Sequence, residues 1–412
     1  MAKKTFTLSA NIENGIAEGL NYIVTPNVQK VLHEIINGYQ TGIHSYSIIG
    51  TYGTGKSSFL LQLEHDLVES HKRNLLKNPK VLYNGKFEIL NILGDFKSLE
   101  ELLRDRLQEA TDSTETNALV LLKSYYSKLK KQGKFLLIAI DEFGKVLEHA
   151  AKINPEEELY FMQKLCEVVN ATTRNILLLT TLHQNFSAYS RKLTTEQKNE
   201  WIKVKGRFQE VVFAEPVEQL LFLAAEHIST EFKYKICDKH FHKIHQLAID
   251  RKFVSADFSF DTACKLYPMD TFAAYAVTRA IQRYGQNERS LFTFLNANGA
   301  HSLASFMPKP NKTYNLAEVY DYVVNSFHSY LTDANSDSTG WSAIRLSIER
   351  VEGGDWKESK QMIDAIKMVK AIGLLNLFGN ASFTMSLLDM EAYATMALDV
   401  EFASTILHEL IR

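Results

Sequence analysis

The residues from Gly50 to Ser58 have the types and the spacing needed to hold phosphate. They read Gly50-Thr51-Tyr52-Gly53-Thr54-Gly55-Lys56-Ser57-Ser58, which satisfies the pattern G-x-x-x-x-G-K-[ST] in full. Glycines let the backbone curl so that successive N–H groups face phosphate oxygens, and the positive end of the following helix attracts the same anion. In this pattern Lys56 can reach the β- and γ-phosphates of a nucleotide, and the Ser57 hydroxyl can ligate Mg²⁺.

A glycine-rich turn without function is the alternative interpretation, and the flanking residues argue against it. Ser47-Ile48-Ile49 before the motif predicts a strand, and Ser58-Phe59-Leu60-Leu61 after it predicts a helix. A strand, a loop and then a helix is the context in which such a loop binds a nucleotide. The sequence therefore predicts an ATP site with Mg²⁺.

A second acidic motif follows the run 135–140. That apolar run ends in Asp141-Glu142, the pattern known as Walker B. Asp141 is predicted to hold Mg²⁺, and Glu142 to polarise the attacking water as general base. A glutamate at this position favours hydrolysis over kinase chemistry, because a kinase must keep water away from the γ-phosphate. The alternative is that the two acids only cap the next helix.

Polar residues also end the next apolar run, Ile176–Thr181. A polar side chain there can lie between the two motifs and sense the γ-phosphate, and Thr181 is the first choice. Thr180, His183 and Gln184 are the alternatives. Simple hydrogen bonding at a strand end would explain the same residues.

Two arginines are candidates for stabilising the transferring phosphoryl group. Arg207 stands in Lys205-Gly206-Arg207-Phe208, just before the last predicted strand. Arg289 follows a predicted helix much later in the chain. Exposed arginines are common on protein surfaces, so neither residue type alone indicates this role.

The elements that must position these residues alternate between strands and helices, which predicts a parallel α/β sheet. Most of the strands are continuous apolar runs, as expected when both faces are covered. The expected strands are Tyr46–Gly50, Phe87–Leu93, Phe135–Glu142, Ile176–Thr181 and Glu210–Phe213. Before the first strand, Thr25 is the expected N-cap of a helix that begins at Pro26.

Three domains are expected along the chain. Residues 1–216 are the predicted ATPase core, 217–307 a helical lid, and 308–412 a helical or winged-helix-like domain. Only helical patterns follow Glu218, and Pro308-Lys309-Pro310-Asn311-Lys312 is the best linker.

Composition limits the remaining function classes. The 412 residues are 45% hydrophobic and 23% charged, with a formal net charge of −2, which is typical of a folded globular protein and not of a globally basic nucleic-acid binder. Cys166, Cys237 and Cys264 match no zinc or redox spacing. No signal peptide or membrane-spanning run is evident, so we expect a cytoplasmic protein without a membrane partner.

The order of these features over roughly the first 300 residues resembles an AAA+ module of the P-loop ATPase class. That resemblance implies a five-stranded parallel sheet with a helical lid. It also implies an arginine finger at Arg207, acting across a subunit interface in a homo-oligomer, and a nucleotide-contacting lid arginine at Arg289. By the same analogy, residues Tyr22–Pro26 and the lid would line the adenine pocket.

Several stretches resemble something narrower, the large ATPases of bacterial anti-phage defence islands of the BREX type. They are Ile140–Glu148, Leu182–Phe186, Glu200–Phe208 and Gly285–Phe292, with a weaker likeness at Ile366–Leu377, an apolar helix that lies in a winged-helix-like region of those proteins. Those ATPases are typically much longer, so an N-terminal fragment or one ordered portion of such a protein is one interpretation of this chain.

Three functions are therefore compatible with the sequence. The first is an ATP-driven switch or motor in defence, acting with an effector protein. The second is a DNA-engaged translocase or loader, suggested by basic clusters such as Lys123 to Lys134, although charge runs are more often solvated faces. The third is a nucleotide-gated scaffold with negligible turnover, against which Glu142 and Arg207 argue.

Overall fold

The computed structural model divides the chain into two compact units, Met1–Glu215 and Pro216–Arg412. The structure describes residues 12, 22–51, 54–69, 73–191, 193–214, 217–231, 239–285, 291–296, 299–306, 312–332, 337–379 and 383–411.

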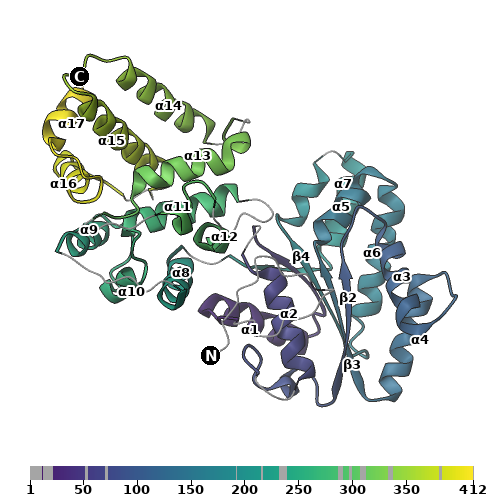
Figure 1. Ribbon diagram of the computed structural model, residues 1–412. Helices are drawn as coiled ribbons and strands as arrows, with labels where there is room; N and C mark the ends of the chain where they lie inside the picture. Colours follow the sequence, from purple (N-terminus) through teal and green to yellow (C-terminus); the bar gives the residue numbers. More distant parts are fainter. Residues whose placement is uncertain are drawn as a thin grey trace. The chain divides into compact units, whose positions relative to one another are not determined.

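The first unit is built on a five-stranded sheet in the order β2-β3-β4-β1-β5, in which all pairs are parallel (Figure 1). The strands are β1 (Ser45–Ile49), β2 (Lys86–Leu93), β3 (Lys134–Asp141), β4 (Ile176–Leu182) and β5 (Gln209–Val212). All five predicted strands are confirmed, each within one residue at either end. Long apolar runs survive at the centre of this sheet because helices cover both of its faces.

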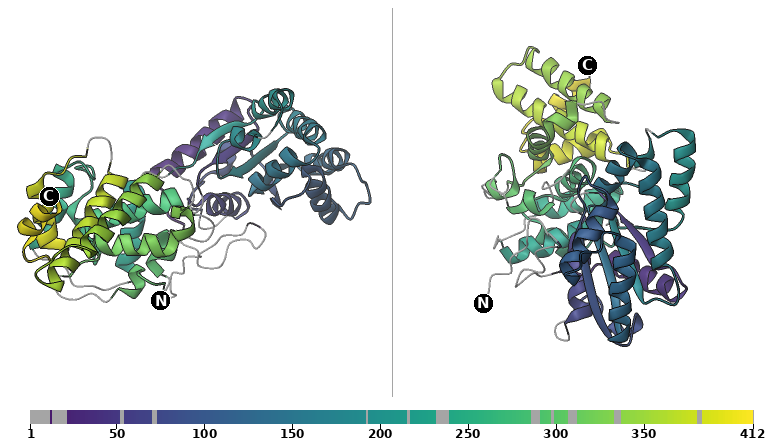
Figure 2. Two further views of the ribbon diagram at one scale, coloured as in Figure 1. Left: turned by 90° about the horizontal axis from the view of Figure 1, so that it is seen from above. Right: turned by 90° about the vertical axis from the view of Figure 1, so that its right-hand side faces the viewer.

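Successive residues of each strand pack into two separate cores, one on each face of the sheet. Phe135, Leu137 and Ala139 of β3 pack on one side, whereas Leu136 and Ile138 pack on the other. Helices α1 (Pro26–Gln40) and α2 (Lys56–Val68) complete the first core. The second core takes in α3 (Leu99–Thr111), α4 (Ala118–Lys131), α5 (Phe143–Lys152), α6 (Pro155–Val169) and α7 (Thr195–Lys205). The unit is thus a three-layer arrangement with helices on both sides of the strands (Figures 1 and 2).

Helix α1 begins where the sequence predicts. The Thr25 side chain accepts a 3.2 Å hydrogen bond from the Val28 N–H, and Pro26 occupies the first turn. A threonine oxygen satisfies an N–H that the first turn leaves without a helical partner, and proline has no N–H to lose there. The apolar face of α1 is buried as predicted, at Val28, Val31, Leu32, Ile35 and Ile36.

Within the described part of the second unit, the regular secondary structure is helical, apart from one isolated bridge between Met269 and Tyr314. Its helices are α8 (Val217–Glu231), α9 (Lys239–Asp250), α10 (Phe260–Lys265), α11 (Thr271–Tyr284), α12 (Leu291–Asn296), α13 (Leu316–Thr332), α14 (Ser338–Glu352), α15 (Ser359–Phe378), α16 (Leu387–Ala397) and α17 (Ala403–Ile411). The sequence predicts either a helical or a winged-helix-like C-terminal domain. In residues 312–332, 337–379 and 383–411 the regular elements are helices. The division of this unit between a lid at 217–307 and a domain at 308–412 stays a prediction.

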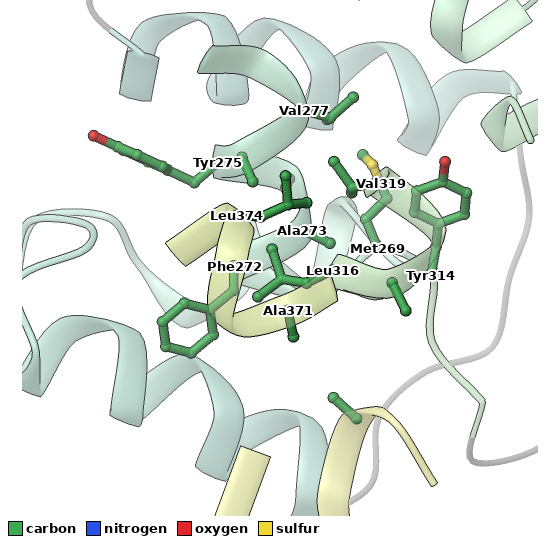
Figure 3. Close-up of a cluster of buried hydrophobic side chains, with 14 of the residues drawn as sticks. Met269, Phe272, Ala273, Tyr275, Val277, Tyr314, Leu316, Val319, Ala371 and Leu374 are labelled. Carbon is green, nitrogen blue, oxygen red and sulfur yellow. The ribbon is translucent and has the colours of Figure 1, made fainter. Parts of the chain in front are cut away.

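One continuous core runs through the second unit. Phe272 and Ala273 of α11, Leu316 and Val319 of α13, and Leu374 of α15 meet in it (Figure 3). Within the part of the chain that the structure describes, no helix has both the length and the apolar character needed to cross a membrane.

Candidate functional site

The strand order creates a natural ligand position beside β1. The helix that follows β1, α2, covers one face of the sheet, whereas the helix that follows its neighbour β4, α7, covers the other. Where connections leave adjacent parallel strands in opposite directions, a crevice opens at their carboxyl ends, and ligands of open α/β sheets bind there. The predicted phosphate loop follows β1, and Thr181 lies near the end of β4.

The phosphate loop has the backbone that the motif requires. Gly55 has a φ of 90°, a left-handed conformation that favours glycine, and it directly precedes α2. A Cβ on Gly50 would meet the Phe213 carbonyl oxygen at 2.1 Å, so only glycine fits between β1 and the end of β5. The first turn of α2 contains no acidic residue, which leaves its positive end open to an anion. Tyr52 and Gly53 lie outside the described residues.

The Lys56 ammonium is folded back over this loop. Its Nζ donates hydrogen bonds to the carbonyl oxygens of Gly50, at 2.6 Å, and Thr51, at 2.9 Å. Burial lowers the pKa of Lys56 to about 8, against the opposing effect of the nearby carboxylates of Asp141 and Glu142. A buried cation held only by carbonyl dipoles is well suited to receive an anionic ligand.

Thr181 connects the ends of β3 and β4. Its hydroxyl donates a 2.5 Å hydrogen bond to Asp141 Oδ1 and accepts one of 3.0 Å from the Glu142 N–H. Asp141 is buried and Glu142 is half-buried. The two acids and the predicted sensor threonine therefore form one hydrogen-bonded group at the carboxyl edge of the sheet.

The backbone at Glu142 has an unusual conformation. Its φ is 53°, in the left-handed region that non-glycine residues seldom adopt, and it serves as the N-cap of α5. A Cβ on Gly94, which follows the neighbouring strand β2, would meet the Glu142 carbonyl oxygen at 2.5 Å. Such outliers occur where the surrounding structure holds a functional side chain in place.

The alternatives to Thr181 take other positions. The Thr180 hydroxyl lies within hydrogen-bond distance of the Ser47 hydroxyl, at 3.0 Å, and bonds to the Tyr46 carbonyl, so it serves the packing of β1 against β4. Gln184 is exposed. Burial lowers the pKa of His183 to about 3, and the positive charges of Lys56 and Lys145 add to this effect, so His183 is a neutral imidazole near the site.

One acidic residue of this region, Glu64, belongs to none of the sequence motifs and was not predicted. Glu64, on α2, is buried, and its Oε2 accepts a 2.9 Å hydrogen bond from the Asn91 side-chain amide on β2. Burial is the main cause that raises the pKa of Glu64 to about 7, and the Asp141 charge contributes to the same rise. Its spacing along α2 matches an ordinary buried helix face, so the sequence carries no signal for it.

Arg207 lies near the amino-terminal end of β1, whereas the phosphate loop follows its carboxyl end. Its backbone carbonyl accepts a 3.3 Å hydrogen bond from the Asn170 side chain, and the other end of the same amide accepts one from the His44 N–H, just before β1. Strands rise about 3.3 Å per residue, so the path from His44 to Gly50 spans roughly 20 Å. The Arg207 guanidinium pairs with Glu167 of α6 at 3.2 Å and remains about one-third exposed, at 34%. The structure therefore does not bring Arg207 to the phosphate loop of its own chain.

The remaining predicted residues contribute less. Arg289 lies outside the described residues. Asn74 donates a hydrogen bond to the Tyr22 carbonyl, and Tyr22 is half-buried beside the core of α1 and α2. Among the residues that the structure describes, no group of three or more His, Cys, Asp or Glu side chains could hold a metal ion. The assignment of Ser57 and Asp141 as Mg²⁺ ligands stays a prediction from the two motifs.

Comparison by sequence finds no matching family model and no matching curated protein. Among solved structures, the chain is similar to the ORC2 protein of Aeropyrum pernix in ADPNP-ADP complexes, with 14% identity over 84% of this chain and 81% of that one and a TM-score of 0.40. It is similar to PCH-2 of C. elegans, with 13% identity over 75% and 70% of the two chains and a TM-score of 0.37. A third is Cdc6p from Pyrobaculum aerophilum, with 11% identity over 93% and 92% and a TM-score of 0.32.

The five parallel strands and the loop that follows β1 agree with the sequence prediction, and the structure adds the order of the strands. A parallel sheet in the order β2-β3-β4-β1-β5 carries a glycine-lysine loop, a buried aspartate and a polar strand end at one edge. The chain therefore has a P-loop α/β fold with a five-stranded parallel sheet, followed by a helical second unit.

Proposed function

We propose that this protein binds ATP at the loop Gly50–Ser58 and hydrolyses it. The observation that carries the proposal is the convergence of three groups at one edge of the sheet. The buried Lys56 ammonium is close enough to Asp141 and Glu142 for their charges to raise its pKa, and Thr181 ties those two acids together. A cation, a metal-binding carboxylate and an acid adjacent to it are the parts that phosphoryl transfer to water needs.

The described part of the loop fits a phosphate ligand. Among the residues that the structure describes, no carboxylate lies within ion-pair distance of Lys56, which instead bonds two carbonyls that an incoming phosphate oxygen can replace. The half-buried Ser57 hydroxyl and the buried Asp141 carboxylate are hard oxygen donors of the kind that Mg²⁺ prefers. When bound, Mg²⁺ would neutralise charge on the β- and γ-phosphates.

The side chains then have separate tasks. Lys56 binds and orients the β- and γ-phosphates. Hydrolysis forms a bond between the water oxygen and the γ-phosphorus and breaks the bond from that phosphorus to the bridging oxygen of ADP. Glu142 accepts the proton of the attacking water. Thr181 fixes the Asp141 side chain relative to the Glu142 backbone through its two hydrogen bonds.

Arg207 is proposed to act in a neighbouring copy of the chain. It lies roughly 20 Å from its own loop along β1, too far for one arginine side chain to reach, and its guanidinium is partly exposed. A second subunit that presents its nucleotide site to this edge would receive the guanidinium as an arginine finger. This supports a homo-oligomer. Arg289 stays a prediction for the lid arginine, and Tyr22–Pro26 for the adenine pocket.

The resemblance to BREX-type ATPases supports, as a further proposal, a role in anti-phage defence together with an effector protein. Loss of phage protection in cells that carry Glu142→Gln in place of the native gene, with protein levels unchanged, is the expected result. Equal protection by the variant would contradict a role that depends on hydrolysis.

Engagement of DNA is the second candidate function, favoured by one helix face. Helix α4 exposes Lys123, Lys128, Lys130 and Lys131, carries no acidic residue, and makes no ion pair in the part of the chain that the structure describes. Such a face can contact phosphates without reading sequence. Salt-sensitive DNA binding that Lys130→Gln with Lys131→Gln weakens would support it, and unchanged binding would contradict it.

The primary test is steady-state ATP turnover by the wild-type protein and by Glu142→Gln, with ATP affinity measured in parallel. We expect the variant to bind ATP as tightly as wild type and to lose at least about a hundredfold in turnover, because removing a general base typically costs that much. ATP retained in stoichiometric amount by both proteins, with no turnover by either, would instead indicate the nucleotide-gated scaffold.

A further inference from the structure

Lys145, in the first turn of α5, forms an ion pair with the proposed general base. Its Nζ lies 2.5 Å from Glu142 Oε2, and both side chains are partly exposed, at 49% and 36%. The Lys145 N–H also bonds to the Glu142 carbonyl at 3.1 Å. The segment Ile140–Glu148 thus contains a lysine that none of the assigned roles uses.

Two features place this lysine at the site and hold it there. Glu142 is the N-cap of α5, so Lys145 lies in the first helical turn that follows it. Gly144 lies against Tyr189 so closely that a Cβ would meet the phenol oxygen at 2.4 Å, which fixes α5 against the segment after β4. The positive charges of Lys56 and Lys145 both lower the pKa of His183.

We propose that Lys145 is a resting clamp on Glu142, which holds the carboxylate in an ion pair until the chain is engaged for hydrolysis. The proposal rests on the role of Glu142 as general base. It assigns Lys145 a positioning role through Glu142 and no direct part in the chemistry.

The physical reason is competition for one carboxylate. A carboxylate oxygen that already accepts a charge-assisted hydrogen bond from an ammonium is held toward that cation and is less available to contact the attacking water. The ion pair must therefore open, or be shared, before Glu142 can act. Partly exposed ion pairs are weak, so the clamp should reduce basal turnover by only roughly two- to fivefold.

The direct test compares basal turnover in Lys145→Gln and Lys203→Gln. Lys203 forms the same kind of pair, with Glu200 three residues earlier at 2.6 Å, on the exposed side of α7. We expect Lys145→Gln to raise basal turnover roughly two- to fivefold at unchanged ATP affinity, and Lys203→Gln to leave it unchanged. Lys145→Arg keeps the cation and should return turnover toward wild type.

A second readout does not depend on activity. Acylation of lysines, followed by mass spectrometry of the intact nucleotide-free protein, reports how firmly each ammonium is held. Glu142→Gln removes the partner charge, so we expect faster acylation of Lys145 by roughly twofold or more, with Lys203 unaffected as internal reference.

The outcomes separate this proposal from the one on which it rests. Equal or lower turnover in a folded Lys145→Gln variant, or acylation of Lys145 that does not respond to Glu142→Gln, would overturn the clamp. Full turnover in Glu142→Gln would instead overturn the assignment of Glu142 as the base.

Discussion

The Thr181 hydroxyl donates a 2.5 Å hydrogen bond to Asp141 Oδ1, across the boundary between β4 and β3. The same oxygen accepts the Glu142 N–H at 3.0 Å. One side chain of β4 therefore sets the orientation of the predicted Mg²⁺ ligand and of the backbone that carries the predicted base. A change at this hydroxyl should alter the chemistry of the site more than its affinity for nucleotide.

Thr181→Val, which keeps the shape and removes the hydroxyl, should lower kcat roughly tenfold or more, because small misplacements of reacting groups are costly. The ATP affinity should change little, since the phosphates bind to the loop and Lys56. Thr180→Val is the matched control, because that hydroxyl bonds Ser47 and Tyr46 inside the sheet. A kcat that falls equally in both variants would mean that the effect comes from packing at β4.

ATP affinity should weaken as the pH rises above 8. The pKa of Lys56 in the free protein is about 8, so above that pH the ammonium progressively loses its charge and its attraction for phosphate. The dissociation constant should increase roughly tenfold between pH 7 and pH 9, since each pH unit above the pKa lowers the protonated fraction about tenfold.

The control for this pH dependence is Lys56→Arg. A guanidinium stays charged throughout this range, so the variant should show a nearly flat pH profile even if its affinity is lower. Calorimetric titration with ATP at each pH measures both proteins. An equally steep profile in Lys56→Arg would exclude Lys56 as the titrating group.

Arg207 should act only between subunits. Arg207→Ala and Glu142→Gln should each lack turnover when pure, the first for want of the guanidinium and the second for want of the base. Mixed together, they should regain part of the wild-type activity, because an intact site of the Arg207→Ala chain can receive the guanidinium of the Glu142→Gln chain.

The mixing experiment can also contradict the action of Arg207 between subunits. Absence of recovery, while light scattering shows that mixed assemblies form, would contradict action in trans. Glu167→Gln offers an independent check, because it removes the carboxylate that holds Arg207 within its own chain at 3.2 Å and leaves the arginine intact. Because this variant keeps both Arg207 and Glu142, it should retain turnover on its own.

The second unit should become less stable as the pH rises toward 7. Asp270 is fully buried, caps α11 by accepting from the Ala273 N–H, and accepts a 2.9 Å hydrogen bond from Tyr393. Burial raises the pKa of Asp270 to about 7. The folded state thus favours the protonated acid, and its contribution to stability is complete below about pH 4 and lost as the pH rises through about 7.

Asp270→Asn tests this assignment, because asparagine caps a helix as well as aspartate and does not titrate. Thermal unfolding between pH 5 and pH 8 should show a smaller loss of stability in the variant than in wild type. Parallel curves for the two proteins would assign the pH dependence to other groups.

Several features of this protein follow from local sequence. The loop Gly50–Ser58, the run that ends in Asp141-Glu142, and the Thr25-Pro26 start of α1 are each defined by residues close together in the chain, so their types and spacing predict their structure. The apolar runs locate all five strands within one residue, because a buried strand must be apolar on both faces.

The tertiary structure decided which side chains meet. The sequence leaves Thr181 among four polar candidates, and only the pairing of β3 with β4 places its hydroxyl on Asp141. The distance of Arg207 from its own loop and the burial of Glu64 likewise depend on how segments distant in sequence pack together. The ion pair between Lys145 and Glu142 forms at a residue with left-handed backbone. The hydrophobic pattern specifies which side chains of a strand are buried, but packing of the whole sheet decides which strands pair and therefore which side chains meet.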